Sequence, residues 1–295
     1  MFIDSFIGFL RVERNYSQHT LRAYAKDLCA FRDFLAGIDG SLSFFSADHD
    51  LVRAWAASLM DAGLASSSVC RKLSSLRAFY DYLLREGYVS GNPASAVQGP
   101  KRRKHLPVFV KESDMDLLLD ERVNGGYEVC RDRMILMLFY ETGIRLSELV
   151  ALDLSSVDIS ASVIKVLGKR ARERIVPFAD GLKREMECYL CERETFVKSS
   201  CSALFLSSRG GRVSRSFVYR MVNRSLGSVG VAKKRSPHVL RHSFATAMLN
   251  NGAEIGVVKE LLGHKRLATT EIYTHLTFEE LKKVYGKAHP RAGIN

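Results

Sequence analysis

The sequence lacks the features that mark secreted, membrane-spanning and zinc-binding proteins. Its six cysteines form no paired framework, and although Cys188 and Cys191 have CxxC spacing, no second pair completes a zinc site. No apolar run approaches the length of a membrane span. The first residues carry Asp4 in place of a basic segment and have phenylalanines at helical spacing, which predicts an amphipathic helix and no export signal. We therefore expect a cytoplasmic protein with reduced thiols, no metal, no other cofactor and no membrane partner.

Positive charge, in contrast, is plentiful and unevenly distributed. The 295 residues carry a formal net charge of +12, which favours a polyanionic partner, although a solubilising surface would give the same excess. Residues 1–98 hold ten Lys and Arg against ten Asp and Glu, so the excess lies in the remainder of the chain. The length is sufficient for two domains, each with its own core.

Residues 1–88 predict four helices. The second begins near Ser17, and the fourth follows Ser66-Ser67-Ser68 and buries an apolar stripe. The basic residues of the fourth helix are candidates for contacts with phosphates, although a solvated helix face is the alternative. They are Arg71, Lys72 and Arg77.

A break in helical order follows this domain. The run QGPKRRKHLP contains four consecutive cations that could follow the backbone of a polyanionic partner, although such a run is also typical of a plain charged linker. These cations are Lys101, Arg102, Arg103 and Lys104. We therefore predict a helical domain over residues 1–90, a basic linker over 91–108 and a second domain over 109–295.

The second domain contains side chains that together could bind and attack a phosphodiester. Arg145 follows a helix break at Gly143, and Ser236-Pro237 predicts a helix start that places His238 and Arg241 one turn apart at the positive end of a helix. His264 follows another predicted helix end, and Tyr273 follows nine residues later. Two guanidiniums can bind phosphate oxygens, two imidazoles can donate hydrogen bonds or transfer protons, and a tyrosine hydroxyl can attack phosphorus.

The segments TGIRLSEL, HVLRHSFATAML, LLGH and TTEIYTH resemble those of the tyrosine recombinase (phage integrase) family, and the whole chain resembles its Xer type. This resemblance implies a mainly α fold with a small antiparallel β-sheet, in which an N-terminal helical core-binding (SAM-like) domain precedes the catalytic domain. The runs SVIKVLG, RERIVPF and ALFLSS read as short strands. The resemblance implies a three-stranded sheet here, with the family's catalytic lysine, Lys169, on the hairpin between its first two strands. Arg170 stands where the family usually has glycine, and Lys165 is the alternative.

The resemblance also implies a division of roles. Tyr273 would form a 3′-phosphotyrosyl link while Arg145 and Arg241 neutralise transition-state charge and Lys169 protonates the leaving 5′ oxygen. His238 and His264 would help to accept the tyrosine proton, and Glu148, one turn beyond Arg145, would orient a basic group.

The resemblance implies site-specific recombination of double-stranded DNA with inverted half-sites, through a Holliday junction in a homo- or hetero-tetramer with a second Xer-type recombinase. Resolution of chromosome dimers at cell division, with a division-associated DNA translocase as a further partner, is the expected role. A mobile-element integrase, a type IB topoisomerase-like enzyme and a catalytically idle DNA-binding protein are the alternatives. The apolar stripe formed by Phe278, Leu281, Val284 and Tyr285 predicts a short C-terminal helix. The resemblance implies docking of that helix on a neighbouring protomer, and docking on its own domain is the alternative.

Overall fold

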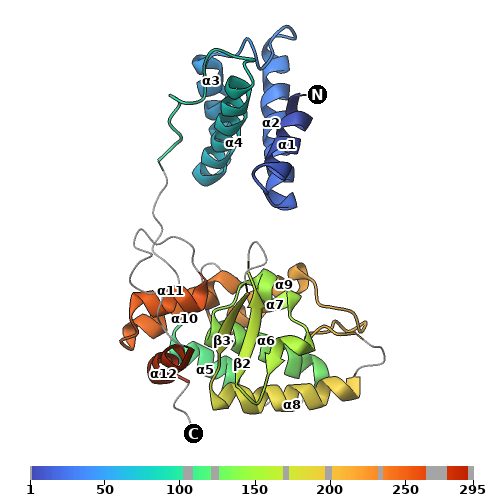
Figure 1. The fold of residues 1–295 in the computed structure, drawn as a ribbon, viewed down its shortest axis with the longest axis vertical. Coiled ribbons are helices and arrows are strands. Elements are labelled where there is room, and N and C mark those ends of the chain that lie inside the picture. Colours follow the sequence, from blue (N-terminus) through green and yellow to red (C-terminus); the bar gives the residue numbers. More distant parts are fainter. Residues whose placement is uncertain are drawn as a thin grey trace. The chain divides into compact units, whose positions relative to one another are not determined.

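A computed structural model describes residues 2–101, 109–120, 126–168, 173–196, 201–231, 235–263 and 278–291. The chain divides into two compact units, Met1–His105 and Leu106–Asn295, each of which we describe by itself. The predicted domain limits of residues 90 and 109 fall near this division and stay a prediction. The expected mainly α fold with a small antiparallel sheet is confirmed (Figure 1).

The N-terminal unit contains the four predicted helices: α1 (Phe2–Val12), α2 (Gln18–Ile38), α3 (His49–Asp61) and α4 (Ser66–Arg85). Ser17 caps α2, since its side chain accepts a hydrogen bond from the backbone N–H of Thr20. The apolar faces of these helices enclose an aromatic-rich core around Phe31, Trp55 and Phe79. The N-terminal unit therefore has a hydrophobic core of its own.

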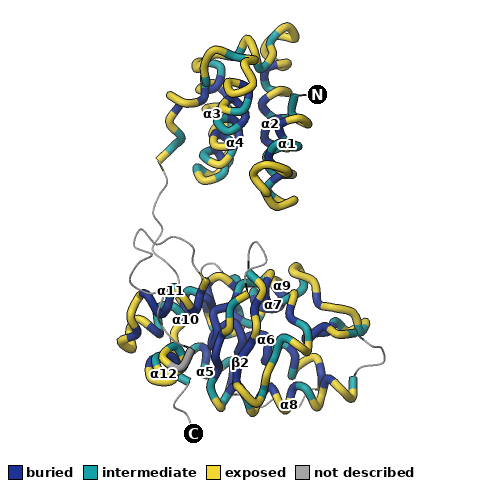
Figure 2. The backbone as a smooth tube through the Cα atoms, in the orientation of Figure 1, coloured by how far each residue is buried: buried dark blue, intermediate teal, exposed yellow. Residues whose placement is uncertain are grey.

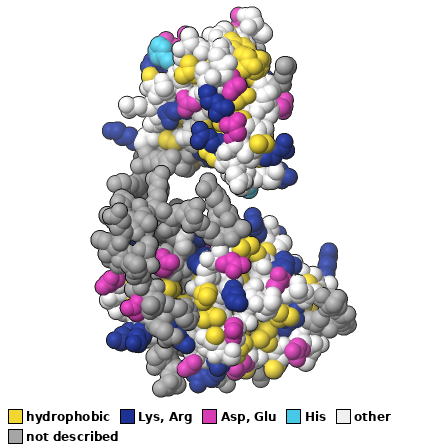
Figure 3. Space-filling model, in the orientation of Figure 1, with side chains coloured by type: hydrophobic (Ala, Val, Ile, Leu, Met, Phe, Trp, Pro, Cys, Tyr) yellow, Lys and Arg dark blue, Asp and Glu magenta, His cyan; other side chains and the backbone are white. Residues whose placement is uncertain are grey.

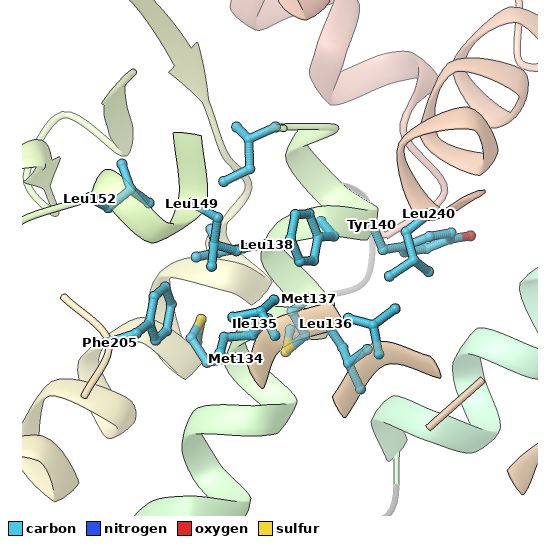
Figure 4. Packing of buried hydrophobic residues seen from close by; sticks show 14 of the residues in the cluster. Met134, Ile135, Leu136, Met137, Leu138, Tyr140, Leu149, Leu152, Phe205 and Leu240 are labelled. Carbon is cyan, nitrogen blue, oxygen red and sulfur yellow. The ribbon is translucent and has the colours of Figure 1, made fainter. Parts of the chain in front are cut away.

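The C-terminal unit is built around α6 (Gly126–Thr142), which is buried along most of its second half. Figure 4 shows its side chains Met134 to Leu138 packing against residues of several other segments, including Leu149, Phe205 and Leu240. The remaining helices of this unit are α5 (Glu112–Asp120), α7 (Leu146–Ala151), η1 (Leu154–Ser156), α8 (Asp180–Phe196), α9 (Arg215–Ser228), α10 (Pro237–Asn250), α11 (Ile255–Leu262) and α12 (Phe278–Ala288). Figure 2 shows buried and exposed residues alternating along α8, as expected for an amphipathic surface helix.

Three short strands form one antiparallel sheet, β1 (Val157–Asp158), β2 (Val163–Leu167) and β3 (Glu173–Pro177), in that order. Val166 pairs with Arg174 and Lys165 with Ile175. The expected assignment of SVIKVLG and RERIVPF is confirmed. The expected strand in ALFLSS is wrong, because the described third strand is β1 and residues 203–208 form only isolated bridges.

The physical reason lies in how the backbone of this segment is hydrogen bonded. Arg193 donates to the carbonyls of Ala203 and Leu204, Tyr189 donates to Leu204, and the Leu206 N–H donates to the hydroxyl of Tyr127. Buried side chains thus satisfy polar groups that a neighbouring strand would otherwise pair. A run of apolar, β-branched or aromatic residues predicts that the segment is buried. It does not predict which groups form hydrogen bonds with its backbone.

The C-terminal helix α12 packs on its own unit. Tyr285 and Ala288 are buried in a cluster with Phe244 and Met248 of α10 and Val258 of α11. The side chain of Asn251 donates a hydrogen bond of 3.0 Å to the carbonyl of Ala288. In this structure α12 therefore occupies the intrachain position that the sequence left as the alternative to docking on a neighbour.

Candidate active site

Arg145 lies at the break between α6 and α7, as its sequence context predicts. Gly143 ends α6 with a φ of +60°, and Arg145 is the N-cap residue of α7. A side chain added at Gly143 would meet a ring atom of Phe244 at 2.5 Å and a methyl of Leu262 at 2.8 Å. The break therefore needs glycine for both its conformation and its space.

Glu148 is the buried carboxylate at the centre of this region. It accepts hydrogen bonds from the Arg145 guanidinium at 2.6 Å and from the Arg145 backbone N–H at 2.8 Å. Arg174 of β3 binds both of its oxygens, at 2.9 and 2.8 Å. Burial by itself raises the pKa of Glu148, but the hydrogen bonds from Arg174 and Arg145 outweigh it and lower the pKa to about 2. Glu148 is therefore ionised at neutral pH.

His238 and Arg241 lie on the first turns of α10. The helix begins at Pro237 as predicted, although the Ser236 side chain makes no capping hydrogen bond. His238 is exposed, whereas Arg241 is buried and donates to the carbonyls of Gly143 at 2.5 Å and Leu262 at 2.6 Å. Burial, with a further contribution from the Arg145 charge, lowers the pKa of Arg241 to about 10, so it stays protonated at neutral pH.

The last turn of α11 brings three arginines together. Three consecutive carbonyls each accept a hydrogen bond from a different guanidinium, and the exit residue Gly263 has a φ of +63°. The pairs are Arg174 with Leu261 at 3.0 Å, Arg241 with Leu262 at 2.6 Å and Arg145 with Gly263 at 3.0 Å. A helix C-terminus carries partial negative charge, which favours such cations. Three guanidiniums facing one carboxylate leave a net charge of +2, which suits an anionic ligand.

Lys169, His264 and Tyr273 lie outside the described residues, so their predicted places in the site stay predictions. Two alternatives can be assessed. Lys165 is exposed and pairs with Ile175, so it points to the face of the sheet opposite Arg174. Tyr285, the alternative nucleophile to Tyr273, is buried on the inner face of α12.

Arg71, Lys72 and Arg77, the predicted DNA-binding residues of α4, have partners within their own unit. Arg71 and Lys72 pair with the buried carboxylate of Asp27, which also accepts a hydrogen bond from Ser75. Arg77 donates to the carbonyls of Ala94 and Val97. Their contact with DNA stays a prediction, as does that of Lys101, which is exposed. Arg102, Arg103 and Lys104 lie outside the described residues.

Arg174 is the residue that the sequence reasoning missed. A signal was present, because the alternation of RERIVPF places Arg174 on the same face of the strand as buried Val176. A cation at an inward-facing strand position indicates a buried partner. The sequence could not identify that partner, since Glu148 is 26 residues away.

None of the described helices is long and apolar enough to span a membrane. No group of three or more metal-binding side chains occurs in the part of the chain that the structure describes. Cys188 and Cys191 are free and exposed on α8.

Comparison with known proteins identifies the class. Residues 109–280 match the phage integrase family, and residues 3–87 match the phage integrase N-terminal SAM-like domain. The chain belongs to the phage integrase family and is a tyrosine recombinase, an enzyme that cleaves and rejoins DNA at specific sites.

Its relatives include Xer recombinases. The chain is 41% identical to tyrosine recombinase XerC of Pelotomaculum thermopropionicum, over 98% of both chains. It is 38% identical to XerC of Oceanobacillus iheyensis, over 100% of this chain and 98% of the relative. XerD of the same organism is 34% identical, over 98% of each chain. The C-terminal run THLTFEELKKVYGKAHPRA also favours the XerC type. The predicted Xer resemblance is confirmed.

Solved structures agree on the fold. XerH recombinase bound to palindromic difH substrate matches with a TM-score of 0.73 at 22% identity, over 92% of this chain and 81% of the other. XerA recombinase matches with a TM-score of 0.50 at 27% identity, over 98% of both chains.

Proposed function

We propose that this recombinase resolves chromosome dimers in the cytoplasm, acting on inverted half-sites in duplex DNA as a tetramer with itself or with a second Xer-type recombinase. The relatives named XerC support the cellular role. A solved relative described as a lambda integrase tetramer bound to a Holliday junction supports the assembly. The translocase that would act with it at cell division is part of the same proposal.

The observation that carries the chemical proposal is the cluster of Arg145, Arg174, Arg241 and Glu148 beside the last turn of α11. A phosphodiester resists attack because its nonbridging oxygens repel the nucleophile and its leaving alkoxide is strongly basic. Arg145 and Arg241 neutralise the charge that grows on those oxygens, and the net positive cluster supports this role. Glu148 orients Arg145, a role supported by its two hydrogen bonds to that residue.

The remaining roles belong to residues outside the described part of the chain, together with exposed His238. Tyr273 attacks phosphorus, and because a phenol with a reference pKa near 10 is mostly protonated at neutral pH, His238 and His264 help to take its proton. Lys169 protonates the departing 5′ oxygen. The phosphotyrosyl product is itself a phosphodiester, so a second 5′ hydroxyl can attack it without ATP.

A nicked suicide duplex carrying the chromosome-terminus site of the host tests the proposal. The wild-type protein should form a covalent adduct, and Tyr273→Phe should bind the duplex without forming one, because only the nucleophilic oxygen is lost. Arg145→Ala and Arg241→Ala should cleave on the order of 100-fold more slowly. An adduct formed by Tyr273→Phe would reject the assigned nucleophile.

A second substrate tests Lys169. A bridging 5′ sulfur is a better leaving group and needs little protonation, so this substrate should rescue Lys169→Ala and leave Arg145→Ala defective. Equal defects of Lys169→Ala on the oxygen and sulfur substrates would reject its assignment as the general acid.

A further inference from the structure

Arg174 directs its hydrogen-bond donors at two protein groups. Both terminal nitrogens bind the Glu148 carboxylate, and Nε donates to the Leu261 carbonyl at 3.0 Å. This bidentate pairing, with two parallel N–H···O bonds to one carboxylate, adds geometric specificity as well as strength. The Leu261 carbonyl fixes the plane of the guanidinium relative to Glu148.

Gly263 closes the slot that holds Arg174. A side chain at this position would lie 3.2 Å from Cδ, 3.3 Å from Nη1 and 3.4 Å from Nε of Arg174. The chain can leave α11 this close to the guanidinium because residue 263 has no Cβ and tolerates a positive φ. The Arg174 side chain, which extends from β3, is therefore confined between Glu148 and the end of α11.

Exposure separates Arg174 from Arg145. The Arg174 side chain is 14% exposed, whereas that of Arg145 is 33% exposed, although both bind the same carboxylate. Arg145 can therefore meet a ligand from solvent more readily than Arg174 can. Arg174 instead affects the charge of Glu148. When Arg174 is present, the single negative charge of Glu148 is shared between two cations. Without Arg174, Glu148 would pair with Arg145 alone.

We propose that Arg174 is a positioning residue for strand cleavage, which neutralises Glu148 so that the positive charge of Arg145 is directed at the scissile phosphate. This inference rests on the proposed phosphate-binding role of Arg145. Removing Arg174 turns Glu148 into a competitor of the phosphate for Arg145. Because Glu148 and the phosphate compete for Arg145 through their negative charges, the loss of cleavage rate on removal of Arg174 should depend on the charge of the phosphate.

That dependence gives a test that a purely structural role would not pass. Single-turnover cleavage is measured on two suicide duplexes, one with the natural phosphodiester and one with an uncharged methylphosphonate at the scissile position. We expect Arg174→Gln to slow cleavage of the natural duplex by on the order of 10- to 100-fold, with duplex affinity nearly unchanged. On the methylphosphonate the defect should shrink to within about threefold, as the larger defect of Arg145→Ala should also shrink, because there is less charge to neutralise.

Two further variants complete the design. Arg174→Lys should fall between wild type and Arg174→Gln, because an ammonium keeps the charge but cannot bind both Glu148 oxygens and Leu261 at once. It also keeps the test available should the glutamine variant not fold. Arg184→Gln, which removes an exposed arginine of α8, should cleave both duplexes at the wild-type rate.

The outcomes separate the two proposals. Equal defects of Arg174→Gln on both duplexes would make Arg174 a purely structural residue and overturn the inference. Normal cleavage of the natural duplex by both Arg174 variants would overturn it as well. If the wild-type protein forms no adduct on either duplex, the proposed function itself fails, and the inference fails with it.

Discussion

Two buried glutamates of the C-terminal unit show how partners decide the charge of a side chain. Glu148 has two arginines on its carboxylate, and its pKa falls to about 2 despite burial. Glu141 is also buried, but among the described residues its Oε2 has no hydrogen-bond partner and its Oε1 lies 4.0 Å from Nε of Arg291. Burial raises the pKa of Glu141 to about 8, and the Arg291 charge only partly opposes this.

We predict that Glu141→Gln stabilises the protein at pH 8 and has little effect at pH 4.5. The folded state holds the Glu141 proton up to about pH 8, whereas the unfolded chain releases it near the ordinary glutamate pKa of 4.5. The stabilising contribution of the protonated Glu141 side chain is therefore complete below pH 4.5 and is lost as pH rises toward 8. This loss is on the order of 4–5 kcal/mol, and an uncharged amide avoids it. Urea unfolding across this pH range measures it.

Glu148→Gln is the control with the opposite sign. Its carboxylate stabilises the folded state above pH 4.5, and that contribution is lost as pH falls from 4.5 to about 2. The variant should therefore lose about 3 kcal/mol at pH 7, because the Glu148 pKa falls from 4.5 in the unfolded chain to about 2 in the folded protein. If Glu141→Gln is less stable than wild type at pH 8, the prediction is wrong. That result would mean that the interactions of the ionised Glu141 carboxylate outweigh the cost of burying its charge.

Among the secondary-structure elements, the link between α6 and α7 determines where Arg145 lies. We predict that Gly143→Ala destabilises the protein by about 2–4 kcal/mol, because the added methyl adds overpacking to backbone strain. Gly252 follows the end of α10 with a φ of +84°, and no atom of the described residues lies within 4 Å of an added Cβ. Gly252→Ala should cost only about 1 kcal/mol of strain.

Thermal or urea unfolding of the two alanine variants gives the comparison. Equal losses at both positions would mean that Phe244 and Leu262 move aside at little cost. In that case cleavage by Gly143→Ala would be expected to remain close to wild type, since the Arg145 break would be preserved.

Local sequence signals predicted the elements whose ends are set by local chemistry. Ser17 at the start of α2, Gly143 at the end of α6 and Pro237 at the start of α10 lie where they were expected. The signals failed for ALFLSS, because part of its backbone is bound by side chains distant in sequence, such as Tyr127, and part by loop backbone, such as that of Leu152. They could not identify the partner of Arg174 for a related reason. Strand alternation marks Arg174 as inward-facing, but its pair with Glu148 is fixed by the packing of β3 against α7 and leaves no local pattern.

At the scale of the whole C-terminal unit, α12 completes a core. Tyr285 stacks on His289 with ring centroids 5.2 Å apart, and its buried hydroxyl makes no hydrogen bond of normal geometry with any described residue. We predict that Tyr285→Ala costs about 3–5 kcal/mol, the range for removal of a large buried aromatic side chain. Tyr285→Phe should be neutral or slightly stabilising, because it removes an unpaired polar group.

Unfolding of dilute protein, repeated at several concentrations, measures both variants. A helix docked only on a neighbouring protomer would leave the dilute protein insensitive to Tyr285→Ala and make wild-type stability depend on concentration. Tyr285→Phe should also form the covalent adduct at the wild-type rate, because Tyr273 is the proposed nucleophile.

Charge is distributed differently in the two parts of the chain. Figure 3 shows cationic and anionic side chains interspersed on one face of the N-terminal unit, consistent with the equal numbers of each sign in residues 1–98. Several of its cations are engaged, such as Arg71 with Asp27 and Arg85 with Glu13. The run from Lys101 to Lys104, in contrast, has no acidic residue within it.

We predict that replacing Lys101, Arg102, Arg103 and Lys104 with glutamine weakens binding to duplexes of any sequence and flattens its salt dependence. Each DNA phosphate that the protein no longer neutralises should reduce the slope of log K against log salt by up to about 0.9, because fewer counterions are released. Binding isotherms at several salt concentrations, on specific and unrelated duplexes, provide the measurement. The matched control replaces Arg184, Lys282, Lys283 and Lys287, four exposed cations of α8 and α12. It lowers net charge equally, so a slope reduced to the same extent by both sets would reflect net charge alone, and only a larger reduction from the linker set would show that these residues contact the DNA backbone.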